Sequence, residues 1–213
     1  MHAIKQLALR PGALPNTVKG KVRKPTPPRR RKDTRPRKHL TPTEVAALLK
    51  AARHSGRYRL RDELSVLLAY RHGLRATELV SLQWSQLDLR GATITVQRAK
   101  GGMTTEHPLR SIELRLLGKL RREAPDSAYV LMTERGTPWT TGNFRKVLQR
   151  LAAVAKLPIS VNPHALRHAC GFYLAGRGVD TRALSHYLGH RSLQSTERYT
   201  AQSAARFKDF FRD

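Results

Sequence analysis

Apolar residues recur with a helical period along most of the chain. The spacing predicts helices over residues 42–54 and 58–72. The first begins at TPTE, residues 41–44, where an N-cap threonine, a proline at the first helical position and a glutamate form a capping box. The second ends before Gly73, which occupies the usual place of a left-handed C-terminal stop.

The period changes to two between residues 93 and 109. Alternating apolar residues in TITVQ and TTEHPL flank a Lys-Gly-Gly sequence, which predicts an antiparallel hairpin. Further helices are predicted over residues 76–82, 111–123, 141–156, 164–176, 180–187 and 192–200, with a last short one ending at residue 211. The expected fold class is therefore mainly α with a small antiparallel β-sheet (α+β), without an internal repeat.

Charge divides the chain unevenly. The 213 residues suit one domain with an appendage, and 41 Lys and Arg against 15 Asp and Glu give a formal charge of +26. Such an excess points to a polyanionic partner. Residues 1–40 hold 13 of these basic residues, one acidic residue and several prolines. We expect a basic, Pro-rich, disordered arm over residues 1–40 and a folded domain over residues 41–213.

The arm is expected to contact nucleic acid, because the rest of the chain is basic too. A targeting or solubility tail is the alternative. The candidate DNA-binding residues of the arm are Lys21, Arg23, Lys24, Arg29, Arg30, Arg31, Lys32, Arg35, Arg37 and Lys38.

Several classes of protein are disfavoured. Cys170 is the single cysteine, which excludes a disulfide framework, and no apolar run reaches the roughly 18 residues of a membrane span. No nucleotide-binding motif occurs, and no acidic cluster would hold magnesium. His164 and His168 have the spacing of zinc ligands, but Ala165 replaces the general-base glutamate of a zincin. We expect a cytoplasmic protein without cofactor or metal.

The sequence is nevertheless rich in groups suited to phosphoryl transfer without metal. Guanidinium groups match the nonbridging oxygens of a phosphodiester with two parallel donors. A tyrosine hydroxyl, with a pKa of about 10, becomes a nucleophile when a base such as histidine assists it. A lysine at a hairpin tip can protonate the departing oxygen.

The arginines, histidines and tyrosine of this kind occur in four motifs: GLRATEL at residues 73–79, HALRH at 164–168, YLGH at 187–190 and RYT at 198–200. In this order the motifs resemble the tyrosine recombinase (phage integrase) family, and longer stretches are most similar to the short fimbrial phase-variation recombinases. The resemblance covers residues 41–207. It implies the DNA breaking-rejoining fold and a site-specific recombinase that cleaves and rejoins duplex DNA through a 3′-phosphotyrosyl intermediate, without metal or ATP.

The resemblance also implies roles for individual residues. Arg75 and Arg167 match the paired phosphate-binding arginines, and Lys100 in the hairpin turn matches the general acid. His164 matches the position that assists deprotonation of the nucleophile, and His190 the position that binds the scissile phosphate.

Tyr199 matches the nucleophile. Its sequence neighbours are polar, whereas Tyr70, Tyr173 and Tyr187 stand among apolar residues and are expected to be buried. Glu78 and His168 are expected to support the reacting groups without reacting themselves. Gln86 departs from the family, where an aspartate is common, which puts one structural hydrogen bond in doubt.

A larger departure from the family lies in the segment before residue 41. Most members of the family have a helical core-binding domain there, and we expect the arm to replace its DNA contacts. The resemblance implies that the tail, about residues 201–213, is exchanged between the subunits of a homotetramer on paired DNA sites. The sequence leaves open whether accessory DNA-bending proteins are further partners. It also does not decide between DNA inversion, integration and excision. A type IB topoisomerase and a catalytically silent DNA-binding regulator are the alternative functions.

Overall fold

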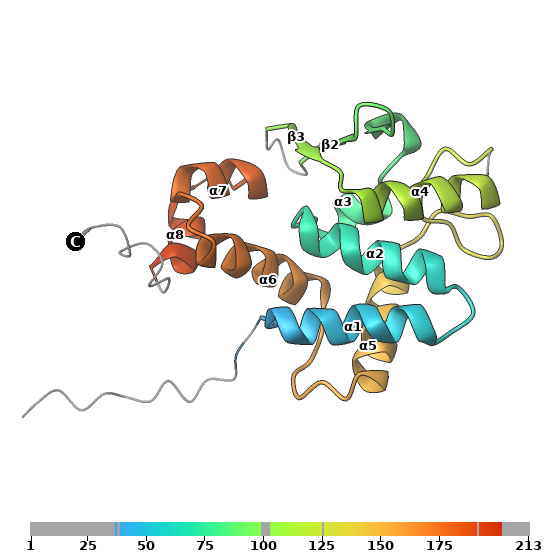
Figure 1. Ribbon diagram of the computed structural model, residues 1–213, viewed down its shortest axis with the longest axis horizontal. Coiled ribbons are helices and arrows are strands. Elements are labelled where there is room, and N and C mark those ends of the chain that lie inside the picture. The colour runs from blue at the N-terminus through green and yellow to red at the C-terminus, as the bar shows by residue number, and fades with distance from the viewer. Residues whose placement is uncertain (1–36, 38, 99–102, 125, 191, 202–213) are drawn as a thin grey trace, which may run out of the picture. The chain divides into compact units, whose positions relative to one another are not determined.

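The computed structural model describes residues 37, 39–98, 103–124, 126–190 and 192–201. This part of the chain is mostly helical, with one small sheet (Figure 1). The helices are α1 (Pro42–His54), α2 (Arg59–Arg71), α3 (Ala76–Val80), α4 (Ser111–Glu123), α5 (Thr141–Val154), α6 (Pro163–Gly176), α7 (Thr181–Leu188) and α8 (Gln194–Thr200). A 3-10 turn, η1 (Trp84–Gln86), precedes the strands β1 (Leu87–Asp88), β2 (Thr93–Val96) and β3 (Thr105–Pro108).

Local side-chain contacts define where helices begin. Thr41 Oγ1 accepts a hydrogen bond from the Glu44 amide at 3.2 Å, and the Glu44 carboxylate accepts one from the Thr41 amide at 2.8 Å. The predicted capping box of α1 is therefore confirmed. At α6 the Asn162 side chain accepts from the Ala165 amide at 3.0 Å, and Pro163 follows, which lacks the amide hydrogen that the first turn could not use.

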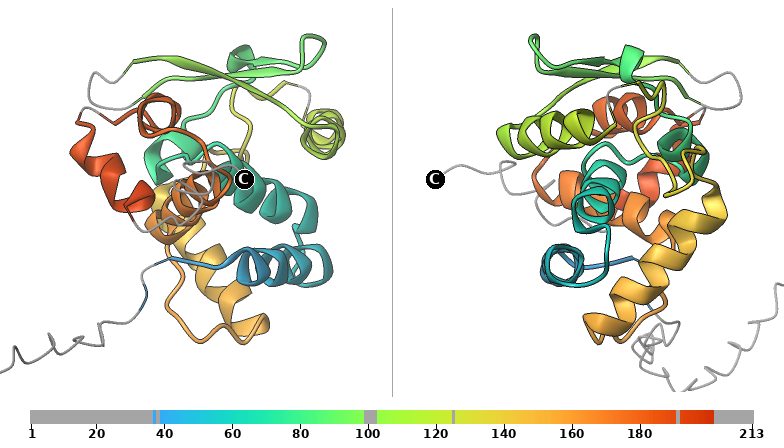
Figure 2. Two further views of the ribbon diagram at one scale, coloured as in Figure 1. Left: turned by 60° about the vertical axis from the view of Figure 1, so that its left-hand side comes forward. Right: turned by 90° about the vertical axis from the view of Figure 1, so that its right-hand side faces the viewer.

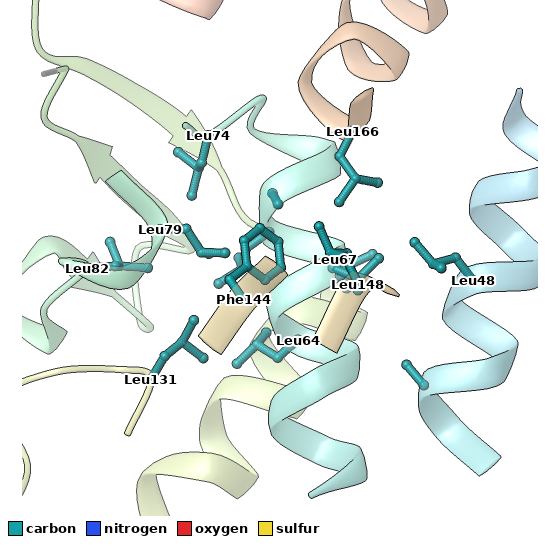
Figure 3. Close-up of a cluster of buried hydrophobic side chains, with 14 of the residues drawn as sticks. Leu48, Leu64, Leu67, Leu74, Leu79, Leu82, Leu131, Phe144, Leu148 and Leu166 are labelled. Carbon is teal, nitrogen blue, oxygen red and sulfur yellow. The ribbon is translucent and has the colours of Figure 1, made fainter. Parts of the chain in front are cut away.

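The helices enclose a hydrophobic core around α2. This helix lies between α1 and α4 in Figure 1 and also packs on α6. Figure 3 shows the core leucines of several elements around Phe144 of α5, which, like Leu64 and Leu148, is completely buried. Burial of this aliphatic surface supplies the main favourable term for folding.

The sheet is antiparallel, with the strand order β1-β2-β3. Ile94 pairs with His107 on one side and with Leu87 on the other. The mainly α fold class with a small antiparallel sheet is confirmed, but β1 was not predicted, because two residues are too few to reveal an alternation. Gln86 accepts from the Gln83 amide at 2.9 Å and donates to the Thr95 carbonyl at 3.0 Å, so a glutamine makes structural bonds at this departure from the family pattern.

Most predicted helices are confirmed to within two residues of their bounds. The hairpin turn at residues 99–102 and the helix predicted to end at residue 211 lie outside the described residues. The packed structure begins earlier than residue 41: Leu40 is buried, and the His39 ring stacks on Phe172 with a centroid distance of 3.9 Å.

The three C-terminal helices group at one end of the domain, with the sheet next to α7 (Figures 1 and 2). This arrangement brings the end of α2, the end of β2 and the carboxyl end of α7 close to α6. The four sequence motifs lie on or directly next to α3, α6, α7 and α8.

Candidate active site

Two helix ends frame the site. Gly73 follows α2 and Gly189 follows α7, and both have left-handed backbone, with φ of 57° and 61°. A Cβ atom at Gly73 would stand 2.5 Å from Leu188 Cδ2, and one at Gly189 would stand 2.5 Å from Arg98 Cγ. Glycine therefore permits both the backbone turn and the close approach of the two helix ends.

Arg167 of α6 joins these two ends from within the domain. Its guanidinium is buried and donates to the Gly73 carbonyl and to the Leu188 carbonyl, both at 2.5 Å. Burial, together with the positive charges of Arg75 and Arg98, lowers the pKa of Arg167 to about 10, so the group stays protonated at neutral pH.

Arg75 lies at the amino end of α3 with a partly exposed guanidinium. Its Nη1 donates to Glu78 Oε1 at 2.6 Å, and its amide donates to Glu78 Oε2 at 2.9 Å. Burial alone would raise the pKa of Glu78, but the hydrogen bonds from Arg75 and the charge of Arg98 outweigh it and hold the pKa below its usual range. Glu78 is therefore an ionised group that orients Arg75.

His190 stands directly after Gly189. Its Nδ1 lies 2.7 Å from Thr196 Oγ1 on α8, which fixes the ring. Burial and the charges of Arg167 and Arg75 lower the pKa of His190 to about 4, so the imidazole is neutral at pH 7.

Tyr199 is buried in the structure, with only 2% of its surface exposed. Its ring packs edge-on against Phe172 at a centroid distance of 5.1 Å, and a Cβ at Gly171 would stand 2.8 Å from it. By contrast, Tyr173 is 44% exposed. The expectation that Tyr173 is buried is thus wrong. Tyr199 is the buried tyrosine, because α6 covers its ring, which its polar sequence neighbours do not reveal.

The hydroxyl of Tyr199 contacts His168, at 2.8 Å from Nδ1. His164 is exposed and meets the His168 ring edge-on, at a centroid distance of 4.3 Å. Burial and the charge of His164 lower the pKa of His168 to about 4, and burial raises the pKa of Tyr199 against the opposing charge of Arg198. The structure thus places His168, rather than His164, against the tyrosine hydroxyl.

An open pocket of about 260 Å³ lies in front of the arginines. Arg75, Arg167 and His164 line it together with Arg145 of α5 and Asn162. Three guanidinium groups around one pocket suit an anion with several oxygens, such as a phosphodiester. Arg145 was not predicted, because an exposed helical arginine carries no signal in the sequence.

Arg98 is a second residue that sequence analysis missed. Its side chain is fully buried and donates to Glu78 Oε2 at 3.0 Å. The alternation of β2 could have revealed it, because Arg98 continues the buried face formed by Ile94 and Val96. Lys100, two residues further on, lies outside the described residues.

Most of the predicted arm also lies outside the described residues. Arg37 is described, and both its terminal nitrogens bind the Glu44 carboxylate, at 2.6 and 2.8 Å. This residue therefore forms an ion pair within the domain, with one third of its side chain exposed.

No group of three or more potential metal ligands occurs in the described part of the chain. None of the helices described is long and apolar enough to cross a membrane.

Comparison with known proteins gives a consistent picture. The profile of the phage integrase family matches residues 38–206. The chain is 38% identical to the type 1 fimbriae regulatory protein FimB of Escherichia coli K12 over 180 residues, which cover 82% of this chain and 90% of FimB. It is 32% identical to the tyrosine recombinase XerA of Pyrococcus furiosus over 81% of this chain, and it spans 60% of the length of that protein.

Solved structures agree on the fold. A crystal structure of XerA recombinase superposes with a TM-score of 0.70 and 24% identity, over 81% of this chain and 63% of that chain. XerH recombinase, bound to its palindromic difH substrate after cleavage, gives a TM-score of 0.68 over 81% of this chain and 52% of that chain.

Proposed function

The chain belongs to the phage integrase family of tyrosine-type site-specific DNA recombinases, and we propose that it breaks and rejoins duplex DNA through Tyr199. The observation that carries this assignment is the meeting of four motif residues at two helix ends: Arg75 donates to the Gly189 carbonyl and Arg167 to the Gly73 and Leu188 carbonyls, while the His190 ring stacks on Tyr199 at a centroid distance of 6.2 Å. These residues come from four separate segments of the chain, and each stands at a position that matches a family motif.

In the proposed cleavage step, the Tyr199 oxygen attacks the scissile phosphorus. The bond between phosphorus and the 5′ oxygen breaks, leaving a 3′-phosphotyrosyl link and a free 5′ hydroxyl. The tyrosine proton passes to a neighbouring histidine, and Lys100 is the proposed donor of the proton to the 5′ oxygen. Attack by the 5′ hydroxyl of another strand reverses the step, so no ATP or redox partner is consumed.

Charge stabilisation in this step is assigned to the arginines. Arg75 and Arg167 neutralise the nonbridging oxygens, and His190 donates a further hydrogen bond to them. Glu78 keeps Arg75 in place through its two hydrogen bonds. The product, inversion, integration or excision, follows from the relative orientation and placement of the two DNA sites.

Duplex DNA is the proposed partner. The formal charge of +26 suits a polyanion, and Arg145 extends the cationic pocket beyond the motif residues. The structural neighbours include XerH with its difH substrate and the Tn1549 transposon integrase with circular intermediate DNA. The working form we propose is a homotetramer on paired sites that exchanges residues 201–213 between copies, with accessory DNA-bending proteins where the site needs them, in the cytoplasm beside the nucleoid.

Covalent capture tests the proposal. The full chain is incubated in EDTA with nicked duplexes drawn from the DNA that flanks its gene, and a denaturation-resistant protein–DNA adduct is sought. We expect an adduct from the native chain and from Tyr173→Phe, a matched exposed tyrosine, and none from Tyr199→Phe. An adduct that survives in Tyr199→Phe would assign the nucleophile elsewhere.

The same experiment separates the alternative functions. A DNA-binding regulator with a silent site would bind a duplex and give no adduct on any of them. A type IB topoisomerase would form the adduct but relax supercoils as a monomer, whereas the proposed recombinase assembles two duplexes.

A further inference from the structure

We propose that Arg98 is a positioning residue of the recombinase site, one that holds the ends of α2 and α7 so that Arg75 and Arg167 face the scissile phosphate. The inference rests on the proposed function and deepens it. Arg98 lies outside the four motifs, just after β2.

The side chain of Arg98 connects three elements. Its Nη1 donates to Glu78 of α3 at 3.0 Å, and its Nη2 donates to the His72 carbonyl at 3.4 Å and to the Tyr187 carbonyl. Among the described residues its Nε has no hydrogen-bond partner, so both terminal nitrogens carry the contacts.

Arg98 and Arg167 repeat one arrangement on neighbouring carbonyl groups. Arg98 donates hydrogen bonds to the carbonyls of residues 72 and 187, and Arg167 donates to the carbonyls of the next residues, Gly73 and Leu188. Both residue pairs stand at the carboxyl ends of α2 and α7. These ends carry unpaired carbonyls and a partial negative charge, which a guanidinium group matches.

Arg98 differs from Arg75 in access to a ligand. The Arg98 side chain is 0% exposed, whereas that of Arg75 is 35% exposed. Arg98 also does not line the pocket of Arg75 and Arg167, so we expect it to act on the phosphate only through other groups. It shares the Glu78 carboxylate with Arg75, so it acts on the orientation of Arg75 as well as on the helix ends.

Without Arg98, Glu78 loses one of its cationic partners, and the ends of α2 and α7 lose a side chain that binds both of them. A buried cation is costly unless it is paired and hydrogen-bonded, and here one carboxylate and two helix-end carbonyls supply the partners. Removing the guanidinium takes a donor from Glu78 and from the His72 and Tyr187 carbonyls, and frees the two helix ends to shift. Small misplacements of this kind reduce the rate of a reaction far more than the affinity for the substrate.

The test compares Arg98→Met and Arg98→Lys with the native full-length chain. Binding to the nicked duplex is measured by fluorescence anisotropy, and adduct formation is measured in single turnover at saturating DNA. We expect DNA affinity within about twofold of native and an adduct rate about 100-fold lower for Arg98→Met. Arg98→Lys, which keeps the charge, is expected to recover part of the rate.

A second substrate separates positioning from loss of structure. A methylphosphonate at the scissile position lacks one nonbridging charge, so it depends less on well-placed arginines. The rate difference between native and Arg98→Met is therefore expected to shrink on this substrate. Arg61→Met is the matched control: Arg61 is 14% exposed, binds a main-chain carbonyl and pairs with Asp62 away from the site. It should lower the melting temperature without lowering the rate per folded molecule.

Three results would overturn the inference: a native adduct rate in Arg98→Met, a loss of DNA affinity as large as the loss of rate, or an equal loss on both substrates. If Arg98→Met does not fold, the same comparisons apply to Arg98→Lys. A native chain that forms no Tyr199 adduct instead contradicts the proposed function, and this inference falls with it.

Discussion

In the proposed cleavage step, the contact between His168 and Tyr199 decides how the tyrosine loses its proton. Burial raises the pKa of Tyr199, so its hydroxyl is un-ionised at neutral pH and needs a base. His168 is neutral at that pH and lies 2.8 Å from the hydroxyl, whereas His164 meets the His168 ring and faces the pocket. The geometry therefore favours His168 as the first acceptor of the proton.

We expect His168→Gln to form the covalent adduct about 100-fold more slowly than the native chain at pH 7, since a positioned base contributes roughly this factor. The deficit should narrow as the pH rises, because a growing fraction of the tyrosine ionises unaided. His164→Gln, one helical turn away, is the matched variant. Single-turnover rates between pH 6 and 9 give the comparison, and a larger loss in His164→Gln would reverse the assignment.

The sequence predicts which elements carry the candidate residues, but not the contacts between these residues. Arg167 and Tyr199 lie on α6 and α8, and Arg75 directly precedes α3, because each motif stands at a helix end or on a helix that the apolar period also predicts. Which histidine touches the tyrosine depends on the rotation of α6 against α8. That rotation is set by packing partners distant in the sequence, such as Phe172.

At the scale of elements, a buried polar network ties α2, β3 and α4 together. His72 Nε2 lies 3.0 Å from the Glu113 carboxylate, and His72 Nδ1 lies 3.2 Å from Nδ1 of His107. His107 also stacks on Tyr187 of α7 at 3.9 Å. Arg71 completes the network by an ion pair with Glu113 at 3.0 Å.

This network predicts that acid destabilises the fold. Burial and the neighbouring charges of His72 and Arg98 lower the pKa of His107 from 6.5 to about 3. Between these two values the unfolded chain binds a proton that the folded chain does not. The contribution of His107 is thus fully present above pH 6.5 and is lost as the pH falls towards 3. Its slope is up to about 1.4 kcal/mol per pH unit.

Urea unfolding between pH 7 and 4 measures this effect. The free energy of unfolding of the native chain should fall with pH, with His168 and His190, whose pKa values are both lowered to about 4, adding to the slope. His107→Gln should be less stable at pH 7 but lose less stability on acidification. His54→Gln, at an exposed position on α1, should keep the native slope. A native slope in His107→Gln would contradict the prediction.

Elements were predicted best where local chemistry defines them. The capping box at Thr41 and the left-handed glycine at Gly73 fix helix ends within a few residues of sequence, and both are confirmed. The strand β1 and the packing of Leu40 depend on partners elsewhere in the fold, Ile94 and the helical core, which no local pattern contains.

At the scale of the whole molecule, the distribution of charge determines how the chain would hold DNA. Residues 1–36 carry 11 of the 41 basic residues, while the cationic pocket lies on the folded domain. Contacts between basic side chains and phosphates release counterions, so each one steepens the dependence of affinity on salt by about 0.9 in a log–log plot. The arm and the domain should therefore contribute separately to the salt dependence of binding.

We expect deletion of residues 1–36 to weaken DNA binding and to flatten this plot, while the domain still binds. The cut retains Arg37, because its ion pair with Glu44 belongs to the capped start of α1. Anisotropy titrations from 50 to 300 mM salt give the slopes. Replacing the four basic residues at positions 29–32 by glutamine keeps the length of the arm and should flatten the slope by up to about 3.6, whereas four lysines there should leave it native. An unchanged slope after the deletion would mean that the folded domain alone holds the duplex.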